Sequence, residues 1–225
     1  MQNLSKRLSL IASFVKEGSN VCDVGTDHGY LPAFLYLSKK CNSVTATDIN
    51  PKPLASARKN LEKMGADGVR LVLCDGVSGV TRSDADTVII AGMGGEVISG
   101  IIGRADFLRD ETVELILQPT TAAKELRLYL SKNGFAVEQE QAVVENNKVY
   151  SVMKAKFCGE KISLNAVEQA IGILKPETDE ARQYIEKQYR IAHKCAIELE
   201  HVAQKAAEYD YYLNLSIQLK NILGG

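Results

Sequence analysis

The chain has 225 residues, a formal net charge of −1, 45% hydrophobic residues and 24% charged residues. These values are typical of a globular protein and exclude a disordered chain, a collagen and a strongly charged tail. They also exclude nucleic-acid binding through bulk charge, so an RNA ligand would need a local cluster of cations. The length allows one large domain, or one of about 150 residues with an appendage.

Membrane, secretion and metal signals are weak. The sequence has no apolar run of about 18 residues, so we expect no membrane span. The first eight residues lack the hydrophobic segment of a signal peptide. The five cysteines form no C-x-x-C pair and the three histidines form no H-x-x-x-H pair. We therefore expect a cytoplasmic protein without a disulfide framework or a bound metal.

Helices and strands alternate along the first two thirds of the chain. Apolar residues recur at helical spacing over residues 3–17, which predicts an amphipathic helix. The segments expected next are a strand at 20–24, a helix at 29–40, a strand at 43–47, a helix at 51–64, strands at 69–73 and 87–91, a helix at 96–103, a strand at 113–117 and a helix at 121–133.

Two further strands, at 135–145 and 148–156, flank Asn146-Asn147, which is a hairpin signal. The earlier strands are almost continuously apolar, and this is typical of a parallel sheet that helices cover on both faces. The sequence therefore predicts a doubly wound, Rossmann-like α/β domain. In such folds, ligands bind beyond the carboxyl ends of the strands.

The C-terminal third has a different pattern. Residues 176–206 and a second segment around 212–222 carry apolar residues at spacings of three and four, which predicts two helices. The turn between them is expected near 207–210. The expected seam is Tyr184, Gln188, Ile191, Cys195, Leu199, Val202 and Ala206 against Tyr212, Leu215, Leu219 and Ile222. We expect an α/β domain at 1–158, a coiled-coil hairpin at 159–225 and, because one chain satisfies this seam, a monomer.

A glycine-containing turn follows the first strand. Asp23, Gly25, Asp27 and Gly29 have the spacing D-x-G-x-D-x-G, whereas a dinucleotide-binding dehydrogenase needs G-x-G-x-x-G. The glycines allow close approach of the backbone to a ligand. An acidic residue here disfavours a pyrophosphate and suits the sulfonium and ammonium groups of S-adenosylmethionine. The competing interpretation is an ordinary strand-to-helix turn.

Two more acidic residues end the next two strands. The carboxylate of Asp48 could accept hydrogen bonds from both hydroxyls of a ribose, and that of Asp75 could accept one from an adenine amino group. Either residue alone could be a solvated loop acid. Together with Asp23, in this order, they favour S-adenosylmethionine over NAD.

Two other segments are expected to reach the same edge of the sheet. Residues 91–95 contain three glycines in four positions, which indicates close approach or unusual backbone angles, unless this is only a flexible loop. The amide of Gln118 could read the edge of a base, and Pro119 could hold it in place. The alternative for this segment is again an ordinary loop.

The first turn holds three further candidates. Asp27 occupies a position where glycine is usual, which favours a functional role. His28 could donate a hydrogen bond to a substrate or merely cap the following helix. Tyr30 could stack on a base or pack inside the protein.

Three cations share one face of the first C-terminal helix. Lys187, Arg190 and Lys194 could meet phosphates, but with Glu186 and Glu198 nearby they could also be the solvated flank of a coiled coil.

Four segments together resemble the bacterial tRNA (adenine-22, N1)-methyltransferase family: residues 5–8 (SKRL), 23–32 (DVGTDHGYLP), 91–95 (AGMGG) and 117–119 (LQP). The similarity covers nearly the whole chain. It implies a class I methyltransferase domain followed by a helical coiled coil, with S-adenosylmethionine as cofactor and tRNA as partner. The reaction implied is methyl transfer to N1 of an adenine in the D-arm.

The resemblance also implies roles for particular residues. It implies that Asp23, Gly25, Asp48, Asp75 and Gly92 line the cofactor. We expect Arg7, Asp27, Ile49, Gly76, Ala91 and Met93 at the cofactor as well. Asp27, His28, Gln118 and Pro119 are expected to face the reacting base. Tyr30, Lys187, Arg190 and Lys194 are expected to bind the tRNA. The chain departs from the family at Thr120, where asparagine is usual, at Asp48, where glutamate is usual, and at Gly29, where alanine is common.

The implied reaction makes modest chemical demands. Adenine N1 has a free in-plane lone pair near neutral pH, so alignment is the main requirement. The product ring gains positive charge, which Asp27 could stabilise, or Asp27 could orient the base. N1 lies on the pairing edge, so a paired target must first be flipped out. The alternatives are a methyltransferase for another RNA or a small molecule, a non-catalytic protein that binds tRNA or cofactor and, more remotely, a nicotinamide dehydrogenase.

Overall fold

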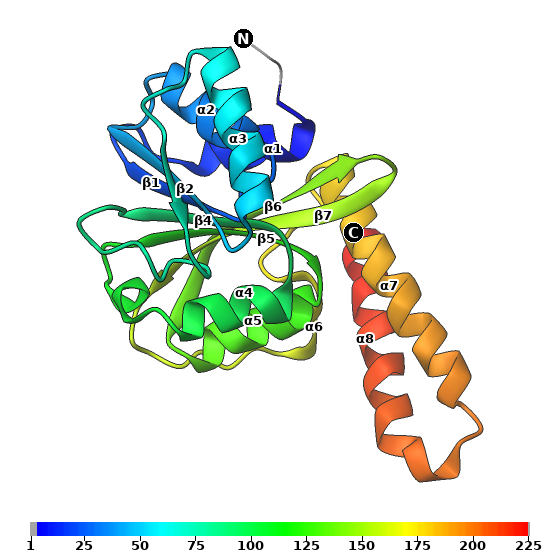
Figure 1. Ribbon diagram of the computed structural model, residues 1–225. Helices are drawn as coiled ribbons and strands as arrows, with labels where there is room; N and C mark the ends of the chain where they lie inside the picture. The colour runs from blue at the N-terminus through cyan, green and yellow to red at the C-terminus, as the bar shows by residue number, and fades with distance from the viewer. Residues whose placement is uncertain (1–3, 225) are drawn as a thin grey trace.

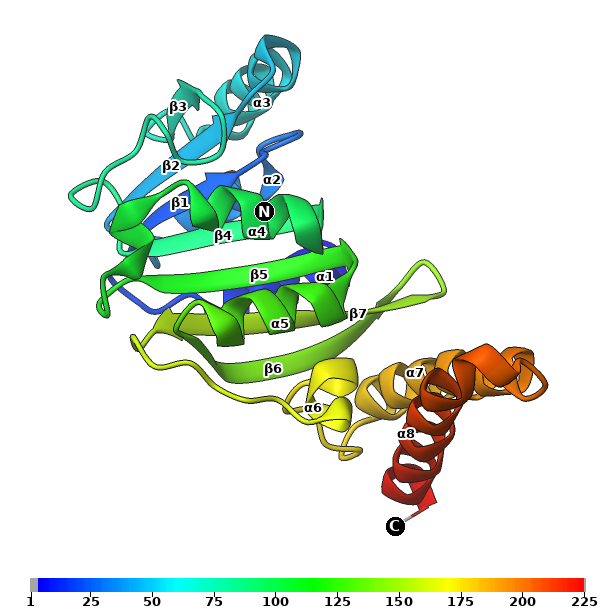
Figure 2. The same cartoon turned by 90° about the horizontal axis from the view of Figure 1, so that it is seen from below.

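The computed structural model describes residues 4–224, so Asn3, in the expected first helix, and residues 1, 2 and 225 lie outside it. A seven-stranded sheet has the order β3-β2-β1-β4-β5-β7-β6. The strands are β1 (Asn20–Val24), β2 (Ser43–Asp48), β3 (Arg70–Leu73), β4 (Thr87–Gly94), β5 (Glu114–Thr121), β6 (Phe135–Glu145) and β7 (Lys148–Phe157). The first five are parallel and β7 runs antiparallel to β5 and to β6. The predicted doubly wound sheet is confirmed (Figure 2).

Helices cover both faces of the sheet. On one face lie α1 (Lys6–Phe14), α2 (Tyr30–Leu37) and α3 (Pro51–Met64). On the other lie α4 (Gly95–Gly103) and α5 (Ala123–Lys132), and the short η1 (Asp106–Arg109) comes between these two in the chain (Figure 1). Neighbouring residues of β4 pack into opposite layers: Ile89 joins the α1–α3 core, whereas Val88 and Ile90 join the α4–α5 core. This double burial explains the continuous apolar character of the strand.

The C-terminal segment forms a helical hairpin that projects from the sheet domain (Figures 1 and 2). After the short α6 (Ala166–Ile171), α7 (Asp179–Leu199) and α8 (Ala206–Gly224) pack side by side, joined by residues 200–205, which include η2 (Ala203–Lys205). The Thr178 hydroxyl accepts the backbone N–H of Ala181 at 3.1 Å and so caps the start of α7. Within residues 4–224, no helix is long and apolar enough to cross a bilayer.

Two details of the predicted hairpin are wrong. The turn falls at 200–205, because residues 207–210 already belong to α8. The seam on α7 is rotated: Ile191 is 47% exposed, while Ile185, Ala192 and Ala196 are buried. The reason is that α7 packs against β6 and β7 as well as against α8, so two stripes of the helix are covered. On α8, the predicted Leu215 and Leu219 are buried as expected.

One buried arginine joins the hairpin to the sheet domain. The Arg127 guanidinium, on α5, donates hydrogen bonds to Glu140 of β6 at 2.6 Å and to the Tyr184 hydroxyl of α7 at 3.1 Å. It also reaches the backbone carbonyl of Ala170 in α6 at 3.1 Å. Burial opposes the charge of Arg127, but the Glu140 carboxylate and the Tyr184 hydroxyl together outweigh that penalty and raise the arginine pKa. The joint therefore combines this charged, hydrogen-bonded cluster with an apolar one, in which residues of α6, α7 and α8 pack against Ala142 of β6 and Val149 of β7.

Candidate active site

The carboxyl ends of β1, β2, β3 and β4 surround a cavity of about 420 Å³. Seven residues expected at the cofactor line it: Gly25, Asp27, Asp48, Ile49, Asp75, Gly76 and Met93. The Asp48 carboxylate is almost buried and accepts the backbone N–H of Asn50 at 2.7 Å. Ile49, by contrast, is 61% exposed although it is a large apolar residue. The cavity thus combines an oriented carboxylate with an uncovered apolar wall.

Two glycines keep this cavity open. Gly25 has φ +76° and Gly76 has φ +61°, a region that side chains other than glycine rarely adopt. A Cβ at Gly25 would collide with the Met93 side chain, and one at Gly76 would lie 2.9 Å from Cγ2 of Ile101. The turns after β1 and β3 therefore bring bare backbone to the edge of the cavity.

A second cavity, of about 340 Å³, adjoins the first and shares Gly25 and Asp27 with it. The expected site residues that line it are Arg7, Asp23, Gly25, Asp27, His28, Tyr30, Ala91 and Gly92. Asp23 is almost fully buried, and burial raises its pKa to about 6 although a hydrogen bond from Thr26 acts in the opposite direction. A cation placed beside Asp23 would stabilise its carboxylate form.

The mouth of the second cavity is polar and aromatic. Oδ2 of Asp27 lies 3.3 Å from Nε2 of His28, and both side chains are more than half exposed. The His28 and Tyr30 rings are 5.6 Å apart and inclined by 37°. The amide of Asn60 donates to the backbone carbonyl of His28 at 3.0 Å and so ties this turn to α3. The exposed Asp27 carboxylate and the two rings are available to a ligand that enters from solvent.

Gln118 and Pro119 lie within β5 rather than in a loop, because this strand extends to Thr121. Oε1 of Gln118 accepts hydrogen bonds from Nη1 of Arg7 at 2.7 Å and from the backbone N–H of Gly92 at 3.1 Å. Its Nε2 donates to the carbonyl of Pro119 at 2.8 Å. Gln118 is fully buried, so the expected contact with a base would require this amide to exchange one of those partners.

Arg7 reaches the second cavity from α1 and has a second anchor in Glu145. The Glu145 carboxylate accepts both the backbone N–H and Nε of Arg7, each at 3.1 Å. Burial alone would raise the pKa of Glu145, but hydrogen bonds from Ser5 and Arg7 leave it below its usual value. Two partners therefore fix the direction of the Arg7 guanidinium beside Gly92.

The three expected cations of α7 lie away from both cavities and differ from one another. Arg190 is paired with Glu186 at 2.6 Å and Lys194 with Glu198 at 3.7 Å. Lys187 instead donates to the carbonyl of Val149 in β7 at 3.4 Å. Only one of the three is thus turned toward the sheet domain.

Helix α4 contributes residues that the sequence analysis did not single out. Val97 and Ile101 of α4 line the first cavity, and so does Arg104, which directly follows the last residue of α4; their spacings of four and three place them on one side of the helix. Val97 is 55% exposed, and Nη2 of Arg104 lies 3.1 Å from Asp75. The sequence signal that could have identified these residues is their helical spacing directly after the glycine-rich segment at 91–95. Among residues 4–224, no group of three or more His, Cys, Asp or Glu is placed to hold a metal ion.

The fold and the site together define a Rossmann-like class I methyltransferase. The defining features are three acidic residues at successive strand ends, glycine turns and a sheet of order 3-2-1-4-5-7-6. Residues 4–153 match the family described as "Methyltransferase domain". A tRNA (adenine(22)-N(1))-methyltransferase of Bacillus subtilis is 31% identical over 172 residues, which are 76% of this chain and 72% of the relative. This chain belongs to that methyltransferase family.

Solved structures agree with this assignment along the whole chain. The m1A22 tRNA methyltransferase TrmK of Bacillus subtilis is 28% identical, with a TM-score of 0.86 over 99% of this chain and 100% of that one. A Streptococcus pneumoniae protein in complex with S-adenosyl-L-methionine is 29% identical, with a TM-score of 0.81 over 98% of this chain and 100% of that one. The similarity thus includes the C-terminal hairpin.

Proposed function

We propose that this enzyme transfers a methyl group from S-adenosylmethionine to N1 of adenine 22 in tRNA. The observation that carries the proposal is the set of carboxylates Asp23, Asp48 and Asp75 around two adjoining cavities at the ends of β1, β2 and β3. The membership of the chain in the family of the Bacillus subtilis relative supports the choice of tRNA and of the adenine.

The first cavity fits the adenosine part of the cofactor. Asp48 is oriented to accept the ribose hydroxyls, and Asp75 to accept the adenine amino group in place of its exposed contact with Arg104. Ile49 and Val97 supply uncovered apolar surface for the two faces of the ring.

The second cavity fits the charged end of the cofactor. The buried Asp23 carboxylate would hold the ammonium group, and the anchored Arg7 guanidinium would hold the carboxylate. Bound there, S-adenosylmethionine supplies a methyl group that is activated by the positive charge on its sulfur. Ala91, Gly92 and Met93 form the wall between the ends of β1 and β4 and would exclude water from the reacting groups.

We expect Asp27, His28 and Tyr30 to receive the adenine, because all three line the second cavity. Because adenine N1 carries a free lone pair, the chain need not remove a proton before transfer and must chiefly hold the ring in line. The methylated ring is a cation, and the Asp27 carboxylate would stabilise it as the charge develops. Tyr30 offers a ring on which the flipped base can stack.

The two parts of the chain have separate roles in this proposal. We propose that residues 1–158 form the catalytic domain and residues 159–225 the tRNA-binding hairpin, with Lys187, Arg190 and Lys194 on the RNA side. Because α7 and α8 cover each other within one chain, the enzyme would act as a monomer, in the cytoplasm where tRNA is found.

Radiolabelled methyl transfer to unmodified tRNA, with nuclease mapping of the product, tests the reaction. We expect label at adenine 22 and none when that adenine is replaced by guanine. Equal labelling of both tRNAs would show a different target. Cofactor binding without transfer to bulk tRNA would instead support a non-catalytic protein.

A further inference from the structure

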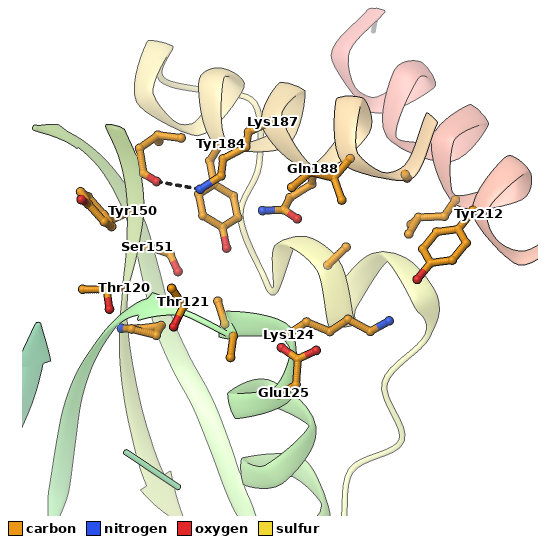
Figure 3. Close-up of a pocket in the computed structure, with 18 residues that line it drawn as sticks. Thr120, Thr121, Lys124, Glu125, Tyr150, Ser151, Tyr184, Lys187, Gln188 and Tyr212 are labelled. Atoms are coloured by element: carbon orange, nitrogen blue, oxygen red, sulfur yellow. Dashed lines mark hydrogen bonds between the residues drawn. The ribbon is translucent and has the colours of Figure 1, made fainter. Parts of the chain in front are cut away.

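A third cavity, of about 340 Å³, lies between the sheet domain and the hairpin (Figure 3). The end of β5 and the start of α5 form one side, β7 a second, and α7 and α8 close it. Its volume is within the range of about 300–1,000 Å³ that small-molecule sites occupy. None of the residues assigned to the cofactor lines this cavity, so it is distinct from the proposed cofactor site.

The third cavity adjoins the active site across one strand. Pro119 lines it, while the side chain of the preceding Gln118 touches Arg7 and Gly92 on the wall of the second cavity. An RNA strand whose target base enters the second cavity would therefore bring a neighbouring nucleotide within reach of the third.

The lining carries two lysines and one carboxylate, that of Glu125. Nζ of Lys124 donates to the Tyr211 hydroxyl at 3.2 Å, so Lys187 is the lysine that suits a phosphate. Lys187 of α7 projects into this space, and Lys124 at the start of α5 also lines it (Figure 3). In the part of the chain that the structure describes, Lys187 has no carboxylate partner and donates only to the Val149 carbonyl. Arg190 and Lys194, in contrast, are already paired with glutamates. Of these three cations, Lys187 is thus the one that is free to bind an anion.

The same lining offers surface for a base. Tyr150 and Tyr212 are half-buried at its edge, and Ile191 is 47% exposed there although it is apolar. The Gln188 amide, which projects from α7 beside Lys187, provides both a donor and an acceptor (Figure 3). Aromatic surface beside lysines is the combination that binds single-stranded nucleotides.

We propose that this cavity binds a nucleotide of the substrate tRNA next to the target adenine. Lys187 contacts its phosphate, and Ile191, Tyr150 and Gln188 contact its base. The inference rests on the proposed function, because it takes the polymer in the cavity to be the methylated tRNA.

The test measures tRNA affinity separately from turnover. The variants are Lys187→Met, which removes the charge, and Ile191→Glu, which places a carboxylate in the lining. The matched control is Lys132→Glu, an exposed lysine in the last turn of α5, at the opposite edge of the sheet. Fluorescence anisotropy gives the Kd for unmodified tRNA at several salt concentrations, calorimetry gives the Kd for S-adenosylmethionine, and label transfer gives the rate.

We expect about a tenfold weaker tRNA affinity for each cavity variant, since each disturbs a contact to a charged group or a buried base. Lys187→Met should also reduce the slope of log Kd against log salt by about one, the loss of a single phosphate contact. The cofactor Kd and the Lys132→Glu control should match the wild type.

Each outcome has a definite meaning. If both cavity variants bind tRNA like Lys132→Glu, with an unchanged salt slope, the subsite is wrong. If Lys187→Met weakens binding of 5′-adenosine monophosphate but not of tRNA, the cavity takes a free nucleotide and the proposal is also wrong. If tRNA binding falls as expected but the wild type transfers no methyl group, the subsite stands and the proposed reaction fails.

Discussion

Nη1 of Arg7 donates a hydrogen bond of 2.7 Å to Oε1 of Gln118, across 111 positions of the chain. The same oxygen accepts the backbone N–H of Gly92, so one buried amide joins α1, the end of β4 and β5 at the wall of the active site. Arg7 and Gly92 are both assigned to the cofactor, whereas Gln118 is fully buried. Gln118 therefore fixes the positions of the Arg7 guanidinium and the Gly92 backbone in this structure.

The first prediction concerns this amide. Gln118→Leu leaves the Gly92 N–H without its acceptor and frees the Arg7 guanidinium, so we expect about tenfold weaker binding of S-adenosylmethionine, together with about 1–3 kcal/mol lower stability. Calorimetry and urea unfolding measure the two effects. Gln118→Glu keeps an acceptor oxygen for both partners and should retain most of the affinity. Equal losses in the two variants would show that the acceptor is not what matters.

The second prediction is a pH dependence. Burial raises the pKa of Asp23 to about 6, above its usual value of 3.8, so the folded protein without cofactor binds more protons than the unfolded chain between these values. The stability that Asp23 contributes is therefore fully present at low pH and is lost as pH rises through about 6. A cationic ligand favours the carboxylate, so cofactor affinity should rise over the same interval.

Calorimetric titrations between about pH 5 and pH 7.5 test this expectation, because that interval brackets the pKa of Asp23. Asp23→Asn should bind the cofactor more weakly and should flatten the profile, since the amide does not titrate. A profile that is unchanged in Asp23→Asn would assign the titration to another group.

The third prediction separates binding from turnover. In Asp27→Asn the side chain keeps its size but loses the charge that would stabilise the methylated ring. We expect kcat to fall by about 100-fold while the affinity for S-adenosylmethionine stays within a factor of a few. Single-turnover transfer to unmodified tRNA measures the chemical step. Full turnover in this variant would exclude the proposed electrostatic role.

The parts of the fold that follow from local pattern were predictable. The sheet domain was confirmed because its strands are apolar on both faces and because Gly65 and Asn146-Asn147 mark chain reversals at the ends of their elements. The acidic residues that end neighbouring strands lie close together because parallel strands end at the same edge of the sheet, and this too was predictable.

Features that depend on distant partners were not predictable. The amide of Gln118 was expected to face a base, but its direction is decided by Arg7, which approaches from α1, 111 positions earlier in the chain. The α7 seam was misplaced because spacing alone does not reveal that β6 and β7 compete with α8 for the same helix. The expected roles of the site residues themselves stay predictions until the variants are measured.

The last prediction concerns the joint between the two parts of the chain. Arg127 and Glu140 form a 2.6 Å ion pair in which both side chains are buried, and Arg127 also holds the Tyr184 hydroxyl of α7. Arg127→Met leaves the Glu140 carboxylate buried without its cation, so we expect about 3–5 kcal/mol lower stability in urea unfolding.

The double variant Arg127→Met/Glu140→Gln removes the unpaired buried charge of Glu140 and should recover part of the lost stability. The hairpin still lacks its hydrogen bond from Arg127 in this variant. Tyr184→Phe removes only that bond and should cost about 1 kcal/mol. If the double variant is no more stable than Arg127→Met, the penalty does not come from the buried charge. In that case the packing of the arginine stem against α6 and α7 must hold the hairpin in place.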